Sequence, residues 1–213
     1  MKRSYKILFV SLSLVYFHAV VNGQDITDTR RKTESFARLQ PADVRADVAS
    51  FSFGGIAESA MANSLDKTQA TIVSKDSLVI SGDGVYAKVM LRPFEPAKHK
   101  LLFEEETNLI RIDRRTYYGN YGRVPKKEIA SVLLIVNGDT LTVPTAAYND
   151  LYNLNFTYLN NGIELSADAV YRSKDGKRVY LYLFNKSREG NYEVTWIFRD
   201  GKYVRRVLDY DFL

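Results

Sequence analysis

Three two-residue turn signals, each set between apolar runs, constrain the fold of this chain more than any other feature. They are Asn137-Gly138, Asp175-Gly176 and Asp200-Gly201. Both central residues of a type I′ turn need positive φ, which Asn, Asp and Gly tolerate best. From Thr71 onward the runs are rich in Val, Ile, Leu, Tyr and Thr, which favour strands. The pattern predicts a mainly β chain of about nine or ten strands with one or two short helices, closed as an antiparallel β-sandwich or a partly open barrel.

A two-residue turn also sets the register of its hairpin, so that opposite residues can be named. In the last hairpin Phe198 is predicted to face Tyr203, and Trp196 to face Arg205 from the aromatic core face. The Arg205 guanidinium would then lie over or beside the indole at the margin of the core. The other predicted pairs are Arg199 with Lys202, Val194 with Val207, Tyr171 with Tyr180, Ala169 with Tyr182, Ala167 with Phe184, Leu134 with Leu141, and Val132 with Val143.

Four further segments have local predictions. A short surface helix is expected around residues 34 to 39, and a strand over residues 49 to 53. The small-residue stretch from 56 to 65 predicts a short packed helix. Residues 144 to 152 predict one or two helical turns, with Thr145 as a possible N-cap because its hydroxyl can accept a backbone N–H bond.

The N-terminus has the layout of a secretory signal peptide. Basic residues at positions 2, 3 and 6 precede an apolar run of 15 residues from Ile7 to Val21. This run is shorter than the roughly 20 residues of a membrane-spanning helix, which disfavours the alternative of an uncleaved anchor. Small residues continue to Gly23, so cleavage is predicted after Gly23 and the signal peptide covers residues 1–23.

The remaining chain is predicted to hold a polar N-terminal tether over residues 24–44 and a single β-rich domain over residues 45–213. Three of the 30 Lys and Arg residues leave with the signal peptide, so 27 remain against 25 Asp and Glu, a net charge of +2. The basic residues form short clusters spread along the chain. A nucleic-acid partner is therefore not expected, and no membrane span is expected after cleavage.

The chain contains no cysteine. An exported domain of this length can bury a core large enough to need no disulfide, and the composition also excludes thiolate catalysis and cysteine-ligated zinc. Export without disulfides points to a bacterial envelope, so a periplasmic or extracellular location is expected. No phosphate loop, dinucleotide fingerprint or calcium-binding loop is present, and no cofactor or metal is predicted.

Several local patterns between residues 94 and 210 resemble a family of small exported bacterial β-rich proteins of uncharacterised function. The resemblance rests on four groups of residues. The first is Phe94 followed by residues 98–100, and the second is residues 109–113 followed by 119–125 and 128–129. The third is residues 143–152, and the fourth is residues 192–196 followed by 201–203 and Asp209. The chain departs from the family pattern at Arg114-Arg115 and at 120–122. The resemblance implies a fold pattern and export, and it implies no catalytic residue.

Candidate site residues are few. After signal cleavage His99 is the only histidine, and it is flanked by Lys98 and Lys100, which depress the basicity of an imidazole. No Gly-x-Ser-x-Gly elbow presents a nucleophile to it, so a hydrogen-bonded structural histidine is the favoured interpretation. Trp196 and Arg205 are candidate binding residues, because aromatic side chains on a sheet can stack against sugar rings or a partner protein. Core burial of the aromatic residues is favoured over that role.

Two hypotheses on function follow from these features. The leading one is an exported non-enzymatic domain that binds a protein or glycan partner, or is structural in the cell envelope. The alternative is an exported hydrolase that depends on carboxylates. Glycoside hydrolysis needs two carboxyl groups roughly 5 to 10 Å apart around a cleft. The run Glu104-Glu105-Glu106 does not provide them, because neighbours on a strand point to opposite faces.

Overall fold

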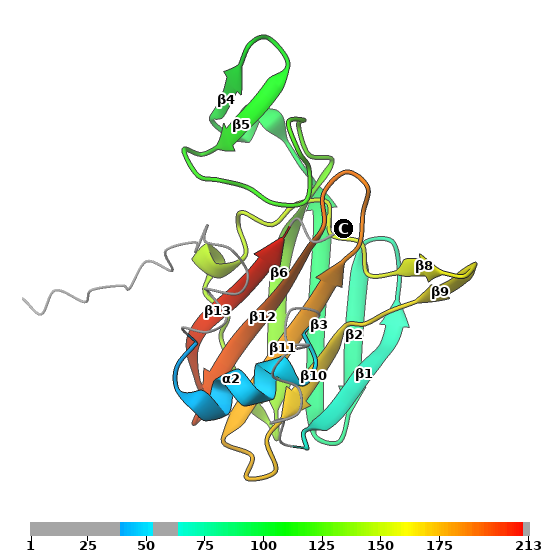
Figure 1. Ribbon diagram of the computed structural model, residues 1–213, viewed down its shortest axis with the longest axis vertical. Helices are drawn as coiled ribbons and strands as arrows, with labels where there is room; N and C mark the ends of the chain where they lie inside the picture. Colours follow the sequence, from blue (N-terminus) through cyan, green and yellow to red (C-terminus); the bar gives the residue numbers. More distant parts are fainter. Residues whose placement is uncertain (1–38, 53–63, 211–213) are drawn as a thin grey trace, which may run out of the picture.

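The computed structural model describes residues 39–52 and 64–210, and within them the chain is mainly β. Nine strands form one antiparallel sheet in the order β13-β12-β11-β10-β1-β2-β3-β6-β7. The sheet is strongly curled into a half-barrel (Figure 1), so the predicted mainly β, antiparallel, partly open barrel is confirmed. Its strands are β1 (Asp66–Val73), β2 (Ser77–Gly82), β3 (Val85–Pro93), β6 (Lys127–Val136), β7 (Asp139–Thr140), β10 (Ala169–Arg172), β11 (Arg178–Asn185), β12 (Tyr192–Arg199) and β13 (Lys202–Tyr210).

Two separate hairpins and three short helical segments complete the described fold. One hairpin pairs β4 (Leu101–Glu104) with β5 (Asn108–Ile112), and the other pairs β8 (Tyr158–Asn160) with β9 (Ile163–Leu165). The helical segments are the α-helix α2 (Ala42–Ala49) and the 3-10 turns η3 (Pro96–Lys98) and η4 (Thr145–Ala147). None of the helices in the described residues is long and apolar enough to cross a membrane.

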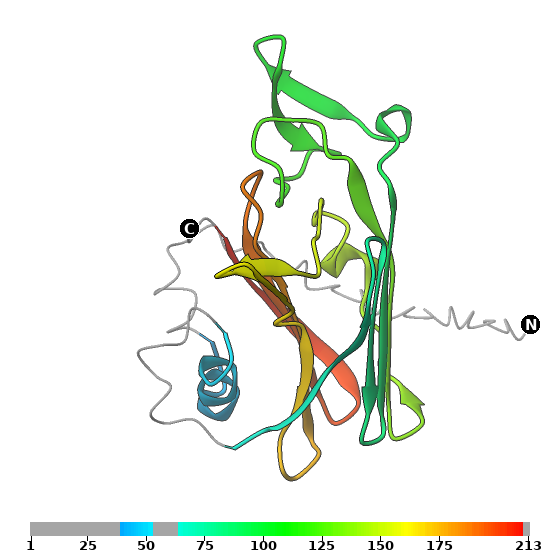
Figure 2. The same ribbon diagram turned by 90° about the vertical axis from the view of Figure 1, so that its right-hand side faces the viewer.

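The curl of the sheet creates an inner and an outer apolar core. Figure 2 shows the two halves of the sheet facing each other, with α2 on the outer side of one half. The inner core joins residues of both halves, among them Leu78, Leu134 and Trp196. Because successive strand residues point to opposite faces, the alternate residues of β11 instead meet α2 in the outer core, where Val48 packs near Tyr180. The two cores explain why all of β12 except its last residue is buried.

Helix α2 corrects the strand predicted over residues 49–53. Ala49 is the last helical residue, and Ser50 to Ser52 form a turn. The prediction was wrong because the apolar residues there match a helix face as well: Val44 and Val48, one turn apart, both point into the outer core. Leu39 and Val44 are buried although they lie in the segment predicted as a tether. The helices predicted around 34–39 and 56–65 lie outside the described residues, except for residues 39, 64 and 65, which are not helical.

The register predicted for the Asp175-Gly176 hairpin is confirmed where β10 and β11 pair. Ala169 lies opposite Tyr182, and Tyr171 lies opposite Tyr180. The predicted pair Ala167–Phe184 lies beyond the ladder, because β10 begins at Ala169. In the Asn137-Gly138 hairpin, the Leu141 backbone N–H donates to the Leu134 carbonyl at 2.8 Å, as its predicted register requires. The predicted pair Val132–Val143 is absent from the described ladder, because β7 ends at Thr140.

The last hairpin starts in the predicted register and then departs from it. Arg199 faces Lys202 and Phe198 faces Tyr203, as predicted. A β-bulge between Ile197 and Phe198 then shifts the pairing by one residue, so Trp196 faces Arg206 and Arg205 faces Ile197. The predicted pairs Trp196–Arg205 and Val194–Val207 are therefore wrong, since Val194 faces Leu208. A bulge puts an extra residue into one strand and turns every later side chain to the other face, which a two-residue turn alone does not reveal.

The 3-10 turn η4 lies on the inner side of the half-barrel and contacts β12 and β13 of the last hairpin. Its Ala147 carbonyl accepts hydrogen bonds from the Trp196 indole Nε1 at 2.9 Å and from Arg206 at 3.1 Å. Arg206 also forms two 2.6 Å bonds to the two carboxylate oxygens of Asp150. Thr145 is the first residue of η4, and Pro144 in the N-cap position makes no side-chain cap bond, so the predicted Thr145 cap is wrong. The helical turn itself is confirmed, as a single 3-10 turn.

Candidate ligand-binding groove

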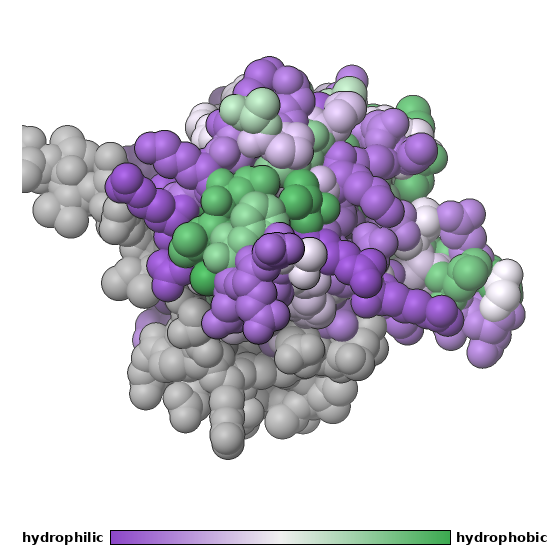
Figure 3. All heavy atoms as spheres, turned by 90° about the horizontal axis from the view of Figure 1, so that it is seen from above, coloured by the Kyte–Doolittle hydropathy of each residue, from purple (hydrophilic) through white to green (hydrophobic). Residues whose placement is uncertain are grey.

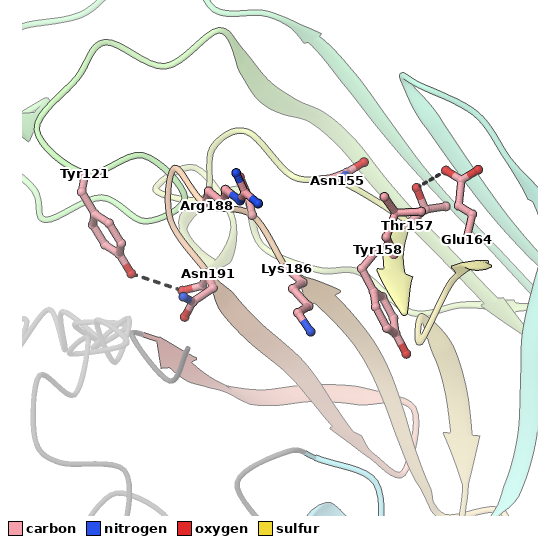
Figure 4. A pocket seen from close by; sticks show the side chains of 10 residues that line it. Tyr121, Asn155, Thr157, Tyr158, Glu164, Lys186, Arg188 and Asn191 are labelled. Atoms are coloured by element: carbon pink, nitrogen blue, oxygen red, sulfur yellow. Dashed lines mark hydrogen bonds between the residues drawn. The ribbon is translucent and has the colours of Figure 1, made fainter. Parts of the chain in front are cut away.

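A groove of about 990 Å³ lies at the rim of the half-barrel, between the β11–β12 connection and the β8–β9 hairpin (Figure 4). This volume is at the upper end of the roughly 300–1,000 Å³ found for small-molecule sites. Most of the lining residues are of polar types. From one end to the other, the labelled side chains in Figure 4 are Tyr121, Asn191, Arg188, Lys186, Asn155, Tyr158, Thr157 and Glu164, and Leu159 and Ser187 complete the lining.

Asn185 holds the two walls of the groove together. This last residue of β11 is fully buried, and its side-chain amide donates to the Gly190 carbonyl at 3.1 Å. Its carbonyl oxygen accepts the backbone N–H of Asn155 at 2.9 Å. One buried side chain therefore joins the β11–β12 connection, which carries Lys186 and Arg188, to the segment that leads into β8.

Close glycine packing places Tyr121 at one end of the groove. A Cβ on Gly190 would lie 2.7 Å from the Gly119 carbonyl carbon and 2.8 Å from the Asn120 nitrogen, so the two loops meet backbone to backbone. Gly119 has φ +96°, and a Cβ there would overlap the Tyr152 carbonyl. The Tyr121 N–H then donates to the Glu189 carbonyl at 2.8 Å. Tyr121 is 48% exposed, and its hydroxyl lies 3.5 Å from the Asn191 carbonyl oxygen (Figure 4).

The middle of the groove is cationic. Lys186 lies with its ammonium nitrogen 5.6 Å from the centre of the Tyr158 ring, within the range of a cation–π contact. Arg188 is exposed two residues further along the same connection. The one carboxylate in the lining, Glu164, accepts a 2.6 Å hydrogen bond from the Thr157 hydroxyl. Two cations thus face one carboxylate that already has a hydrogen-bond donor.

His99 lies at a second, smaller cavity of about 220 Å³ that shares no lining residue with the groove. Its Nδ1 is 2.7 Å from Asp113 Oδ2, and its Nε2 is 3.2 Å from Glu128 Oε2. The ring also stacks on Phe94 with 4.5 Å between centroids. Both ring nitrogens have carboxylate partners, so His99 is hydrogen-bonded as expected, and its structural role stays a prediction.

The electrostatics of Asp113 agree with its role as a partner of His99. Burial raises the pKa of this carboxyl, but the hydrogen bonds from the Lys100 backbone N–H and from His99 outweigh burial and hold the pKa below its ordinary value. Glu128 is also paired with Arg92, whose Nε lies 2.6 Å from Glu128 Oε1. Within the described residues no group of three or more His, Asp or Glu side chains is arranged to hold a metal ion.

The three residues singled out in the sequence lie at three separate places, and none of them lines the groove. Trp196 is fully buried in the inner core, and Arg205 lies opposite Ile197 on the other face of the sheet. Sequence reasoning missed Lys186, Arg188 and Tyr121, because no short motif marks residues that come from two loops far apart in the chain. The number of tyrosines, 15 in the chain, was the one signal related to the groove.

The fold and the groove define a class: a curled antiparallel half-barrel with a ligand-sized, polar groove at its rim. No protein-family model, curated protein or solved structure matches the chain. The resemblance to small exported bacterial proteins therefore remains a prediction, and any function has to be inferred from the groove itself.

Proposed function

We propose that this protein is an exported, non-enzymatic binding domain whose groove holds an extended acidic glycan. The composition of the groove carries the proposal: amides and hydroxyls for sugar hydroxyl groups, two tyrosine rings, and two cations against a single carboxylate. Tyrosine offers an apolar face for a sugar ring together with a hydroxyl for hydrogen bonding. Arg and Lys form charge-assisted bonds with carboxylate or sulfate groups.

The same lining favours binding over hydrolysis. Glycoside hydrolases of the common kind use two carboxyl groups on either side of the scissile bond. Glu164 is the only carboxylate that lines the groove within the described residues. Asp113 and Glu128, which lie together at the smaller cavity, both face His99. The carboxylate-dependent hydrolase is therefore the less supported alternative.

Binding to defined polysaccharides tests the proposal. Polygalacturonate, which carries a carboxylate on each sugar, is expected to bind in calorimetry, and neutral dextran is not. Raising the salt concentration to about 1 M should weaken binding, because salt screens exposed charges. Arg188→Ala and Tyr121→Ala should each weaken binding by roughly tenfold, the equivalent of about 1.4 kcal/mol.

Tyr86→Ala is the matched control. Tyr86 is 38% exposed on β3 and does not line the groove, so its replacement should leave polysaccharide binding unchanged. Failure of the wild-type protein to bind any acidic or neutral polysaccharide would remove the proposed function. Steady release of new reducing ends from a bound polysaccharide would instead support the hydrolase.

Export is part of the proposal and has its own measurement. The protein recovered from its native host should begin at Gln24, because the small residues that suit signal peptidase end at Gly23. Intact mass decides the point, and a chain that retains residues 1–23 in the membrane fraction would contradict cleavage.

A further inference from the structure

The β4–β5 hairpin projects beyond the end of the large sheet (Figures 1 and 2). An isolated two-stranded hairpin is marginally stable in water. Here its inner face is anchored, because Leu109 and Ile112 are buried beside Phe94. At its base Asp113 accepts bonds from the His99 ring and from the Lys100 backbone N–H, at 2.7 and 2.8 Å. The hairpin is thus a firmly held arm.

The outer side of this arm is apolar and open to solvent. Leu102 is 50% exposed, and Ile110 is 39% exposed. Phe103 is also 39% exposed, but it pairs with the buried Leu109 and so lies on the other face of β4. Viewed from above in Figure 3, apolar side chains gather over this hairpin and polar residues surround them. Apolar patches with a polar rim on an ordered surface mark interaction sites.

The order of charges along β4 points to the partner. The Asp113 N–H donates to the Lys100 carbonyl at 2.9 Å, which extends the ladder one residue before β4. The bulge in this hairpin places its extra residue, Ile110, on β5, so β4 alternates regularly. Lys100, Leu102 and Glu104 therefore share one face, in the order cation, apolar, anion. Arg111 pairs with Leu102 and lies on the same face, and its guanidinium donates to the Arg114 carbonyl at 3.4 Å, so its charge lies toward the Lys100 end.

This order of side chains is self-complementary, because read in the opposite direction it gives anion, apolar, cation. In a two-fold arrangement, an antiparallel copy of the same face sets Leu102 against Leu102 of the second copy. Lys100 of each copy then lies opposite Glu104 of the other. Two-fold contacts between identical chains use the same patch on both subunits and need this kind of self-complementarity.

We propose that the β4–β5 hairpin is a homodimer interface, in which two copies pack the Leu102 face of β4 face to face and antiparallel. A second copy covers the apolar centre of this face and places an opposite charge at each of the two ends of the face. A lipid bilayer is the less suitable partner, because the hairpin tip that would enter it carries Glu104, Glu105 and Glu106, and buried carboxylates are costly. The interface is independent of the groove and its ligand.

Sedimentation velocity on the purified protein, at concentrations up to about 1 mM, tests the dimer, since interfaces below about 1,200 Å² belong to weak complexes. The wild-type protein is expected to show a concentration-dependent dimer. Lys100→Glu and Glu104→Lys should each weaken it by about tenfold or more, because each places like charges opposite one another twice. The double variant Lys100→Glu/Glu104→Lys restores opposite charges and should recover the wild-type dissociation constant to within about threefold.

Leu102→Asp should abolish the dimer. Its matched control is Leu159→Asp on the β8–β9 hairpin, where a 70% exposed leucine lies outside the proposed interface, so the dimer should persist. A wild-type monomer across the whole concentration range would overturn the proposal, as would a double variant no better than the single ones. Flotation with vesicles of anionic phospholipid, lost in Leu102→Asp, would assign the hairpin to a membrane surface instead.

Discussion

Arg205 and Arg206 are adjacent cations on β13 with opposite surroundings. Arg206 is 5% exposed and makes both of its short bonds to Asp150 inside the inner core. Arg205 lies on the other face, opposite Ile197. The contrast follows from the bulge, which turns the second arginine inward at the level of Trp196. It makes the pair a residue-scale test of the observed register.

Arg206→Ala should destabilise the protein by roughly 3–5 kcal/mol, because it leaves the buried Asp150 carboxylate without its partner. Arg205→Ala should change the free energy of unfolding by about 1 kcal/mol or less, as for most partly exposed positions. Urea unfolding followed by Trp196 fluorescence measures both. The reverse ranking would mean that the unshifted register, with Arg205 opposite Trp196, is the real one.

At the scale of elements, the groove depends on how closely the β11–β12 connection approaches the loop that carries Tyr121. Gly190 makes that approach possible, because any Cβ there would meet backbone atoms of the other loop within 3.0 Å. Backbone atoms cannot rotate away as the end of a side chain can. The two loops must therefore separate if residue 190 is larger than glycine.

Gly190→Ala should weaken polysaccharide binding by about tenfold or more, since it moves Tyr121 away from the cations of the groove. It should also lower stability by roughly 1–3 kcal/mol, the usual cost of overpacking. Gly176→Ala, in the β10–β11 turn, is the control: a Cβ there has no neighbour within 4 Å, so only backbone strain at φ +70° is added. Calorimetric binding that is equal in the two variants would disprove the steric argument.

At the scale of the whole molecule, one buried carboxyl links stability to pH. Asp168 is 2% exposed, and burial raises its pKa to about 7, although bonds from the Phe184 N–H and the Ser166 hydroxyl favour the ionised form. An unfolded aspartate has a pKa near 3.8. Between about pH 4 and pH 7 the folded state therefore binds more protons than the unfolded state, and the Asp168 contribution to stability falls as pH rises.

Urea unfolding at pH 5 and at pH 8 should show this contribution. We expect the wild-type protein to lose roughly 2.5 kcal/mol more than Asp168→Asn between the two values, because about two pH units of the interval lie below the folded pKa and each unit corresponds to about 1.4 kcal/mol. The asparagine keeps an acceptor for the Phe184 N–H and cannot ionise. Identical pH profiles for the two proteins would show that Asp168 is ionised throughout, or that its ionisation does not affect stability.

Local chemistry in the sequence determined the hairpins of this protein. Asn137-Gly138 and Asp200-Gly201 have positive φ at both central residues, as their side chains predict, and the pairs next to these turns follow. At Asp175-Gly176 only the glycine has positive φ, and the Gly176 N–H donates to the Ser173 carbonyl, so the predicted type I′ turn is wrong there. The predicted pairs beyond that turn are still correct, because the two-residue period of the strands sets them. The same local rules, applied to residues 49–53, failed. There the burial of Val44 and Val48 against a distant sheet decided in favour of a helix.

Only the tertiary structure decided the bulge, the groove and the arrangement around His99. The bulge at Ile197 leaves no mark in composition, yet it decides which arginine meets Asp150. Lys186 and Tyr121 come from two loops and Tyr158 from strand β8, and the curl of the sheet and the contact of Gly190 with Gly119 bring them together. Their proximity depends on contacts between residues far apart in the chain, and a pattern confined to neighbouring residues carries no information about such contacts.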